Sequence, residues 1–131
     1  MYYKTRLQMK NELEKEFVPY QEALALKELG FDKPCFGYYD CERDFKFIPN
    51  KEKFLVCEIA APTFSQAFRW FREKYEYNTE IVWMTAVNFK YSARVKSKLG
   101  TDYIDEHGTY EEAELACLRK LIEIVKQKNN K

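Results

Sequence analysis

A helix-start signal recurs three times along the chain, at intervals of about 45 residues. Pro19 suits the first turn of a helix, because its missing N–H has no partner there in any case. Thr63 with Gln66 and Thr109 with Glu112 have the spacing of capping boxes. The three signals predict helices that begin near residues 19, 63 and 109 and separate two non-helical stretches.

A further helix precedes these three. Met9, Leu13 and Phe17 recur every fourth residue, which predicts an amphipathic helix over residues 1–18. Pro19 ends this helix, because proline disfavours the helical conformation of the residue before it.

The two stretches between the later helices have the patterns of short strands. Aromatic and β-branched residues gather in runs of four to eight residues, which is typical of strands. The second trio includes a nearly continuous apolar run, as expected of a covered strand, and a segment with clean alternation. The expected strands are 35–39, 45–48 and 54–59, then 81–87, 89–98 and 103–107.

These elements predict an α+β fold with helices packed on antiparallel sheets. The length of 131 residues fits one domain. We expect the N-terminal helix (1–18), two α-β-β-β pseudo-repeats (19–62 and 63–108) and a C-terminal helix (109–127). The pattern leaves open whether the strands form one sheet or two.

Composition excludes several classes of protein. No apolar run approaches the about 20 residues of a membrane span, and the first residues contain no apolar segment typical of a secretory signal. Without such a signal, the four cysteines predict reduced thiols and a cytoplasmic location. A net charge of +1 argues against a general binder of polyanions.

Motifs for catalysis and metal binding are weak. The four glycines are scattered, so no glycine-rich loop can cradle a phosphate. Cys35 and Cys41 are spaced too widely for a zinc knuckle, although Cys57 and His107 could complete a site. A cysteine paired with His107 is the one conceivable nucleophile. We expect no metal, no cofactor and no enzymatic activity.

A row of cations lies on the alternating strand. Lys90, Arg94 and Lys96, followed by Lys98, share one face, which could meet phosphates or an acidic partner. If Leu99 and Gly100 form the hairpin turn, Arg94 lies opposite Asp105, and ion pairs neutralise part of the row. We favour this ion-paired alternative.

The aromatic content of 17% exceeds what a small core needs. Trp70 lies about 120° from the apolar stripe of its helix, so it either covers the edge of the core or anchors a partner. Tyrosine gives rigid contact area at low entropic cost. The candidate surface tyrosines are Tyr2, Tyr3, Tyr38, Tyr39, Tyr75 and Tyr77.

The last helix has an apolar face wider than a sheet requires. Leu115 and Ile122 lie at its margin. They are expected to contact either the N-terminal helix or a second copy of the chain.

Two resemblances add to this interpretation. The segments 20–31, 61–74 and 110–114 resemble small uncharacterised proteins of phages, prophages and related elements in gut-type bacteria. This resemblance implies a phage accessory protein in the bacterial cytoplasm, and such proteins often bind a host protein, defence proteins included. Residues 63–126 are similar in element order to double-stranded-RNA-binding domains, but the last helix begins with three glutamates where that family places cations.

Together these patterns predict a non-enzymatic protein that binds a host or phage macromolecule. Trp70, Tyr38, Tyr39 and Tyr77 would be the apolar anchors, and the cationic row would steer an acidic partner. The alternatives are nucleic-acid binding through Lys90–Lys98, or sequestration of a small signalling nucleotide.

Overall fold

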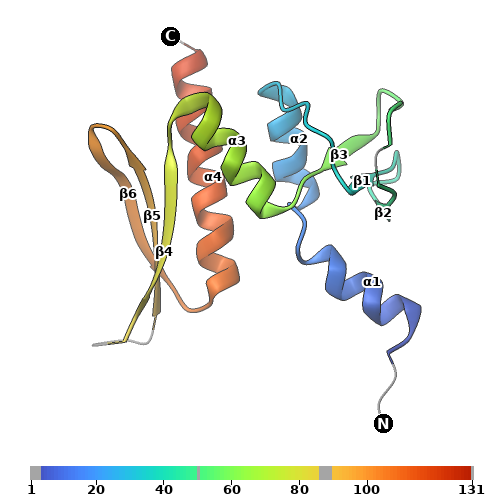
Figure 1. Cartoon of the computed structure of the whole chain (residues 1–131), viewed down its shortest axis with the longest axis horizontal. Coiled ribbons are helices and arrows are strands. Elements are labelled where there is room, and N and C mark those ends of the chain that lie inside the picture. The colour runs from blue at the N-terminus through green and yellow to red at the C-terminus, as the bar shows by residue number, and fades with distance from the viewer. Residues whose placement is uncertain (1–3, 50, 86–89, 131) are drawn as a thin grey trace. The chain divides into compact units, whose positions relative to one another are not determined.

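A computed structural model of the chain describes residues 4–49, 51–85 and 90–130 and shows an α+β protein (Figure 1). The element order among these residues is α-α-β-β-β-α-β-β-β-α, as the helix-start signals predict. The chain divides into two compact units, Met1–Ser65 and Gln66–Lys131. The boundary lies close to residue 63, the expected start of the second pseudo-repeat.

Two helices open the first unit. Helix α1 (Arg6–Glu14) begins at Thr5, whose side chain forms a capping box. It is shorter than the helix expected over residues 1–18, because Phe17 leaves the helix, pairs with Thr63 in an isolated β-bridge and is buried.

Helix α2 (Tyr20–Glu28) ends as predicted at Gly30, which has a φ of 100°. The Gly30 and Phe31 N–H groups donate to the carbonyls of Lys27 and Leu26 at 3.0 and 2.9 Å. This is a Schellman motif, which needs a left-handed residue and therefore favours glycine.

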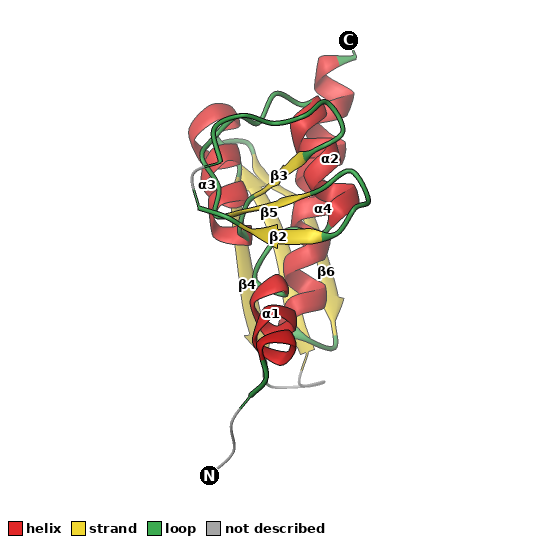
Figure 2. Cartoon of the chain, turned by 90° about the vertical axis from the view of Figure 1, so that its right-hand side faces the viewer, coloured by secondary structure: helices red, strands yellow, loops and turns green. Residues whose placement is uncertain are grey.

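Three short strands form the sheet of the first unit: β1 (Gly37–Tyr39), β2 (Phe45–Phe47) and β3 (Ile59–Ala61). The sheet is antiparallel in the order β2-β1-β3, and its two outer strands, β2 and β3, are labelled in Figure 2. A side chain at Gly37 would lie 2.5 Å from the ring of Phe45, so glycine lets that ring cover the strand. The strand expected over 54–59 is wrong: residues 54–58 are a loop, and pairing with β1 begins only at Ile59.

The second unit begins within the first turn of α3 (Phe64–Tyr75) and continues with β4 (Asn78–Met84), β5 (Lys90–Ser97), β6 (Gly100–His107) and α4 (Tyr110–Asn129). Its strands form an antiparallel sheet in the order β4-β5-β6, and α4 packs on this sheet, mainly over β5 (Figure 1). As predicted, α4 begins at Thr109, whose hydroxyl accepts the Glu112 N–H at 3.1 Å. The side chains of α4 that are fully buried include Cys117, Leu118, Leu121 and Val125.

The hairpin of the second sheet differs from its expected geometry by one residue. Ser97 pairs with Gly100, so the turn consists of Lys98 and Leu99 instead of Leu99 and Gly100. A bulge between Val95 and Lys96 then sets the register of the remaining pairs. A shift of one residue moves every side chain to the other face of its strand.

Strand β4 is only half covered, whereas a covered strand was expected there. Its side chains alternate between exposed and intermediate burial, and Trp83 is 57% exposed. Tyr2 and Tyr3, which were expected at the surface, and Val87 and Phe89, which were expected in strands, lie outside the described residues.

The two strand trios form two sheets with different strand orders. In the first unit the central strand is β1, the first of its three strands along the chain. In the second unit it is β5, the second of its three. The two α-β-β-β segments therefore share an element order but differ in how their strands pair.

Candidate binding site

The loop between β2 and β3 carries apolar side chains that project into solvent. Phe54 is 42% exposed, Leu55 64% and Val56 95%. Three consecutive exposed apolar side chains are unfavourable in water unless a partner covers them. We call residues 54–56 the apolar tip.

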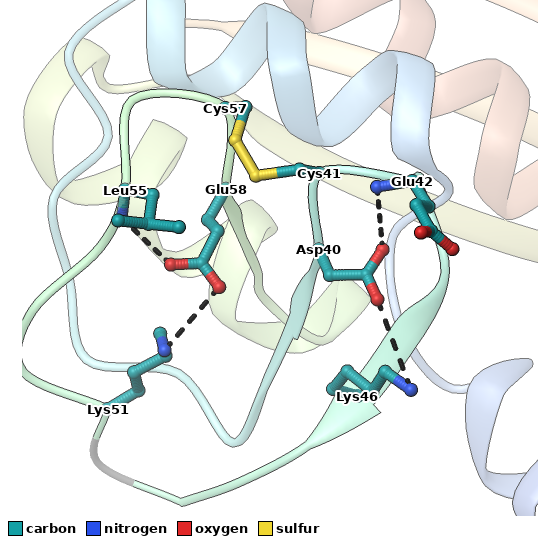
Figure 3. Close-up of polar contacts among 8 residues, drawn as sticks. All are labelled: Asp40, Cys41, Glu42, Lys46, Lys51, Leu55, Cys57 and Glu58. Carbon is teal, nitrogen blue, oxygen red and sulfur yellow. Dashed lines mark hydrogen bonds and ion pairs between the residues drawn. A yellow bond between two sulfur atoms is a disulfide. The ribbon is translucent and has the colours of Figure 1, made fainter.

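The backbone of the apolar tip is nevertheless held at several points (Figure 3). The Leu55 N–H donates to the Glu58 carboxylate at 2.8 Å, and the Lys27 ammonium of α2 donates to the Val56 carbonyl at 3.1 Å. Next to the tip, Cys57 forms a disulfide with Cys41, with the two Cα atoms 5.0 Å apart. The expectation of four reduced thiols is therefore wrong for this pair.

Glu58 links the tip to the rest of the first unit. Its side chain is buried, and its second carboxylate oxygen lies 3.5 Å from the Lys51 ammonium (Figure 3). The same ammonium lies 4.5 Å from the centre of the Tyr38 ring and interacts with its π face. Because Glu58 contacts both Leu55 and Lys51, its buried carboxylate is paired. These contacts join the beginning and the end of the loop.

The turn that carries Cys41 is also held by side-chain contacts. Asp40 accepts hydrogen bonds from the N–H groups of Glu42 and Asp44, both at 2.9 Å. Its other oxygen lies 3.9 Å from the Lys46 ammonium of β2 (Figure 3). The disulfide thus ties the tip to a turn whose backbone is itself fixed.

A cavity of about 650 Å³ lies between α2, the segment after it and the loop that carries the tip. Its charged lining residues are balanced in sign, which does not favour a polyanion such as a nucleotide. They are Lys27, Lys33 and Lys51 with Asp32, Glu52 and Glu58. Cys35 also lines this cavity, and burial raises the pKa of its thiol to about 12.

The four predicted aromatic anchors are buried: Trp70 belongs to the core, which is one of its two expected alternatives, and the expectation of surface side chains is wrong for the three tyrosines. Trp70 is 5% exposed and packs against Phe71 and Tyr75, while Tyr77 lies under the Lys128 ammonium. The ring contacts of Trp70 lie within α3, whereas the cation over Tyr77 comes from α4.

The other two anchors are core residues of the first unit. Tyr39 donates its hydroxyl proton to the buried Val18 carbonyl at 2.8 Å, and Tyr38 packs against Phe54. Burial is the main cause that raises the pKa of Tyr39 to about 12.

The predicted cationic row is largely ion-paired, but with other partners than expected. Arg94 and Lys96 both contact Glu80 on β4, at 3.8 and 2.8 Å, and Lys98 contacts Glu76 at 3.0 Å. Arg94 lies opposite Ile104, not Asp105, because of the one-residue difference in register. The hydrogen bond from Lys96 is the main cause that lowers the pKa of Glu80. Lys90 is exposed.

The two candidate oligomer contacts differ in exposure. Ile122 is 6% exposed and belongs to the core, while Leu115 is half-buried. Leu115 lines a groove between α4 and β6 together with Tyr103 and His107. A contact of this groove with a second copy stays a prediction.

The remaining titratable groups do not form a nucleophilic pair. Burial raises the pKa of Cys117 to about 11, so this thiol, like that of Cys35, is protonated at neutral pH. His107 lies 3.8 Å from Asp105 through its Nε2 atom. Within the described ranges, no three His, Cys, Asp or Glu side chains are grouped to hold a metal ion.

Sequence reasoning missed the apolar tip because it assigned residues 54–59 to a strand. Two signals could have found it. The run has no alternation, and Lys51, Glu52 and Lys53 directly precede it. The separation of 16 residues between Cys41 and Cys57 is compatible with a closed loop, but pairing cannot be read from spacing alone.

Comparison of the chain with family models, curated proteins and solved structures found no match. None of the helices in the described part of the chain combines the length and apolar character needed to cross a bilayer.

Proposed function

We propose that the chain is a non-enzymatic protein-binding module, which inserts the apolar tip into an apolar depression of a partner protein. One observation carries this proposal: Leu55 and Val56 expose their side chains while their backbone groups are held by Glu58 and Lys27. The resemblance to phage proteins suggests a host protein, such as a defence protein, as the partner.

A held backbone matters because ordering a flexible loop on binding opposes association. The disulfide and the contacts of Glu58 and Lys27 order this loop before any partner arrives. The exposed tip then offers apolar area whose removal from water is favourable, at about 25 cal/mol per Å². A few side chains buried at the centre of an interface contribute most of its binding energy.

Charge argues against the nucleic-acid alternative. A surface that binds phosphates needs cations that are free to replace counterions. Arg94, Lys96 and Lys98 are instead engaged by Glu80 and Glu76. Three glutamates at or near the start of α4 also disfavour phosphates at that helix N-terminus.

The test is a pull-down from bacterial lysate with tagged protein, split into nuclease-treated and untreated halves. We compare the wild type with Leu55→Asp/Val56→Asp, in which carboxylates replace the two most exposed apolar side chains of the tip. Leu99→Asp/Ile104→Asp is the matched control, because Leu99 and Ile104 are 98% and 60% exposed in the second unit.

The expected result is one protein captured in stoichiometric amount by the wild type and the control, with or without nuclease. The tip variant should lose it, and with purified partner its binding should weaken by about 3 kcal/mol. Capture that persists in the tip variant, capture of nucleic acid alone, or no capture at all would each refute the proposal.

A further inference from the structure

Helix α1 is poorly covered by the described parts of the chain. It has nine residues, and none of its side chains is buried. Isolated helices of fewer than about 12 residues are marginal in water, and most helices are stabilised by packing of their apolar face. Helix α1 has a capping box at Thr5, but its apolar side chains, Leu7, Met9 and Leu13, are 47–66% exposed.

One face of α1 lines an apolar groove with strand β2. Met9 and Leu13 lie four residues apart and form one wall. Phe45 and Phe47 of β2 form the other wall, and Phe47 is 50% exposed. The groove has a volume of about 210 Å³, room for one or two aliphatic side chains. None of its lining residues belongs to the apolar tip.

The charged groups that line this groove are cations. Arg6 and Lys10 lie on the same helical face as Met9 and Leu13, and no acidic side chain lines the groove. Within the described ranges, Arg6 and Lys10 form no ion pair, whereas Lys4 on the same segment is paired with Glu12. The groove therefore combines apolar walls with two cations at its edge.

We propose that this groove binds an acidic amphipathic helix of a partner protein. Apolar side chains of the partner, spaced three or four residues apart, would enter the groove between Met9, Leu13 and Phe47. Carboxylates beside them would pair with Arg6 and Lys10. A groove suits a helix, whose apolar side chains at i, i+3 and i+4 can enter it as anchors. Binding covers α1 and therefore stabilises it.

The probe is a synthetic peptide of about 18 residues with leucine at positions i, i+3, i+4 and i+7 and glutamate elsewhere. A second peptide has lysine in place of glutamate. We expect the glutamate peptide to bind the full chain about tenfold more tightly than the lysine peptide, with an affinity that falls as salt rises. Hydrogen exchange of the α1 amides should slow on binding.

The sharpest variant is Arg6→Glu/Lys10→Glu, which reverses the charge of the groove without removing an apolar contact. It should lose about tenfold in affinity for the glutamate peptide and gain affinity for the lysine peptide. Arg72→Glu/Lys126→Glu is the matched control: it makes the same change in net charge at two exposed positions of the second unit. Leu13→Gln should weaken both peptides.

Three outcomes would overturn the inference. The first is that the wild type binds the two peptides equally. The second is that Arg6→Glu/Lys10→Glu still binds the glutamate peptide more tightly than the lysine peptide. The third is that the wild type binds vesicles of anionic lipid more tightly than the glutamate peptide. The Leu55→Asp/Val56→Asp variant should bind the peptide as the wild type does. Failure of the apolar tip as a binding surface therefore leaves this inference testable on its own.

Discussion

At the scale of single residues, the second unit is distinguished by a carboxylate shared between two cations. Glu80 lies directly opposite Arg94 across the strand pair β4–β5 and diagonally opposite Lys96. Cross-strand pairs of opposite charge stabilise a sheet modestly. Here they also remove two cations from a row that could otherwise attract a polyanion.

Replacement of Glu80 by glutamine should therefore strengthen binding to polyanions. We expect Glu80→Gln to elute from a heparin column at higher salt than the wild type, because Arg94 and Lys96 lose their common partner. Glu73→Gln, which removes an exposed carboxylate of α3, is the control for the change in net charge. Equal elution of Glu80→Gln and Glu73→Gln would contradict this prediction.

The same pair has a defined pH dependence. Since the folded-state pKa of Glu80 is lowered below its ordinary value of 4.5, its contribution to stability is present above that value. The contribution is lost as the pH falls through the lowered pKa. The wild type should then approach the heparin affinity of Glu80→Gln.

At the scale of elements, the loop between β2 and β3 depends on a covalent link. The Cys41–Cys57 disulfide closes a loop with a sequence separation of 16. A cross-link of this length stabilises a fold mainly by restricting the unfolded chain. Without the disulfide, the backbone of the tip is still held by Glu58 and Lys27.

Loss of this disulfide should lower the free energy of unfolding by about 3 kcal/mol. The comparison is urea unfolding of Cys41→Ser/Cys57→Ser and of the wild type, with and without reductant. Reductant should lower the stability of the wild type but not that of the double serine variant. Cys35→Ser, which changes a free thiol, should respond to reductant as the wild type does. Titration of four free thiols in denaturant without reductant would show that the disulfide does not form.

At the scale of the whole molecule, the chain consists of two compact units, each with its own antiparallel sheet. In the second unit, the contacts of α4 with all three strands bury a continuous apolar face. Both tryptophans of the chain, Trp70 and Trp83, belong to this unit. Tryptophan fluorescence therefore reports on the second unit alone.

A fragment of residues 63–131 should fold by itself, since it contains the whole of α3, the sheet β4-β5-β6 and α4. We expect a cooperative urea transition in its tryptophan fluorescence, because Trp70 is buried in the folded unit. The fragment Leu118→Ala should unfold at lower urea, with a loss of about 3 kcal/mol for a fully buried leucine. A broad, non-cooperative transition of the unmodified fragment would argue against an independent core.

The sequence by itself determined the order of helices and strands and several of their ends. Caps such as Thr109, the end of α2 at Gly30 and the alternation along β5 depend on interactions within a few residues. Such local interactions are visible in a sequence pattern because their spacing is set by the backbone geometry of one element.

Only the tertiary structure decided which side chains meet. A bulge and a turn placed one residue earlier put Ile104 opposite Arg94 in place of Asp105, and the pairing of β4 with β5 brought Glu80 to Arg94 from the other side. The pairing of Cys41 with Cys57 likewise joins segments that are separated by 16 residues in the chain. These outcomes follow from register and packing between elements, which the periodicity of a single element does not specify.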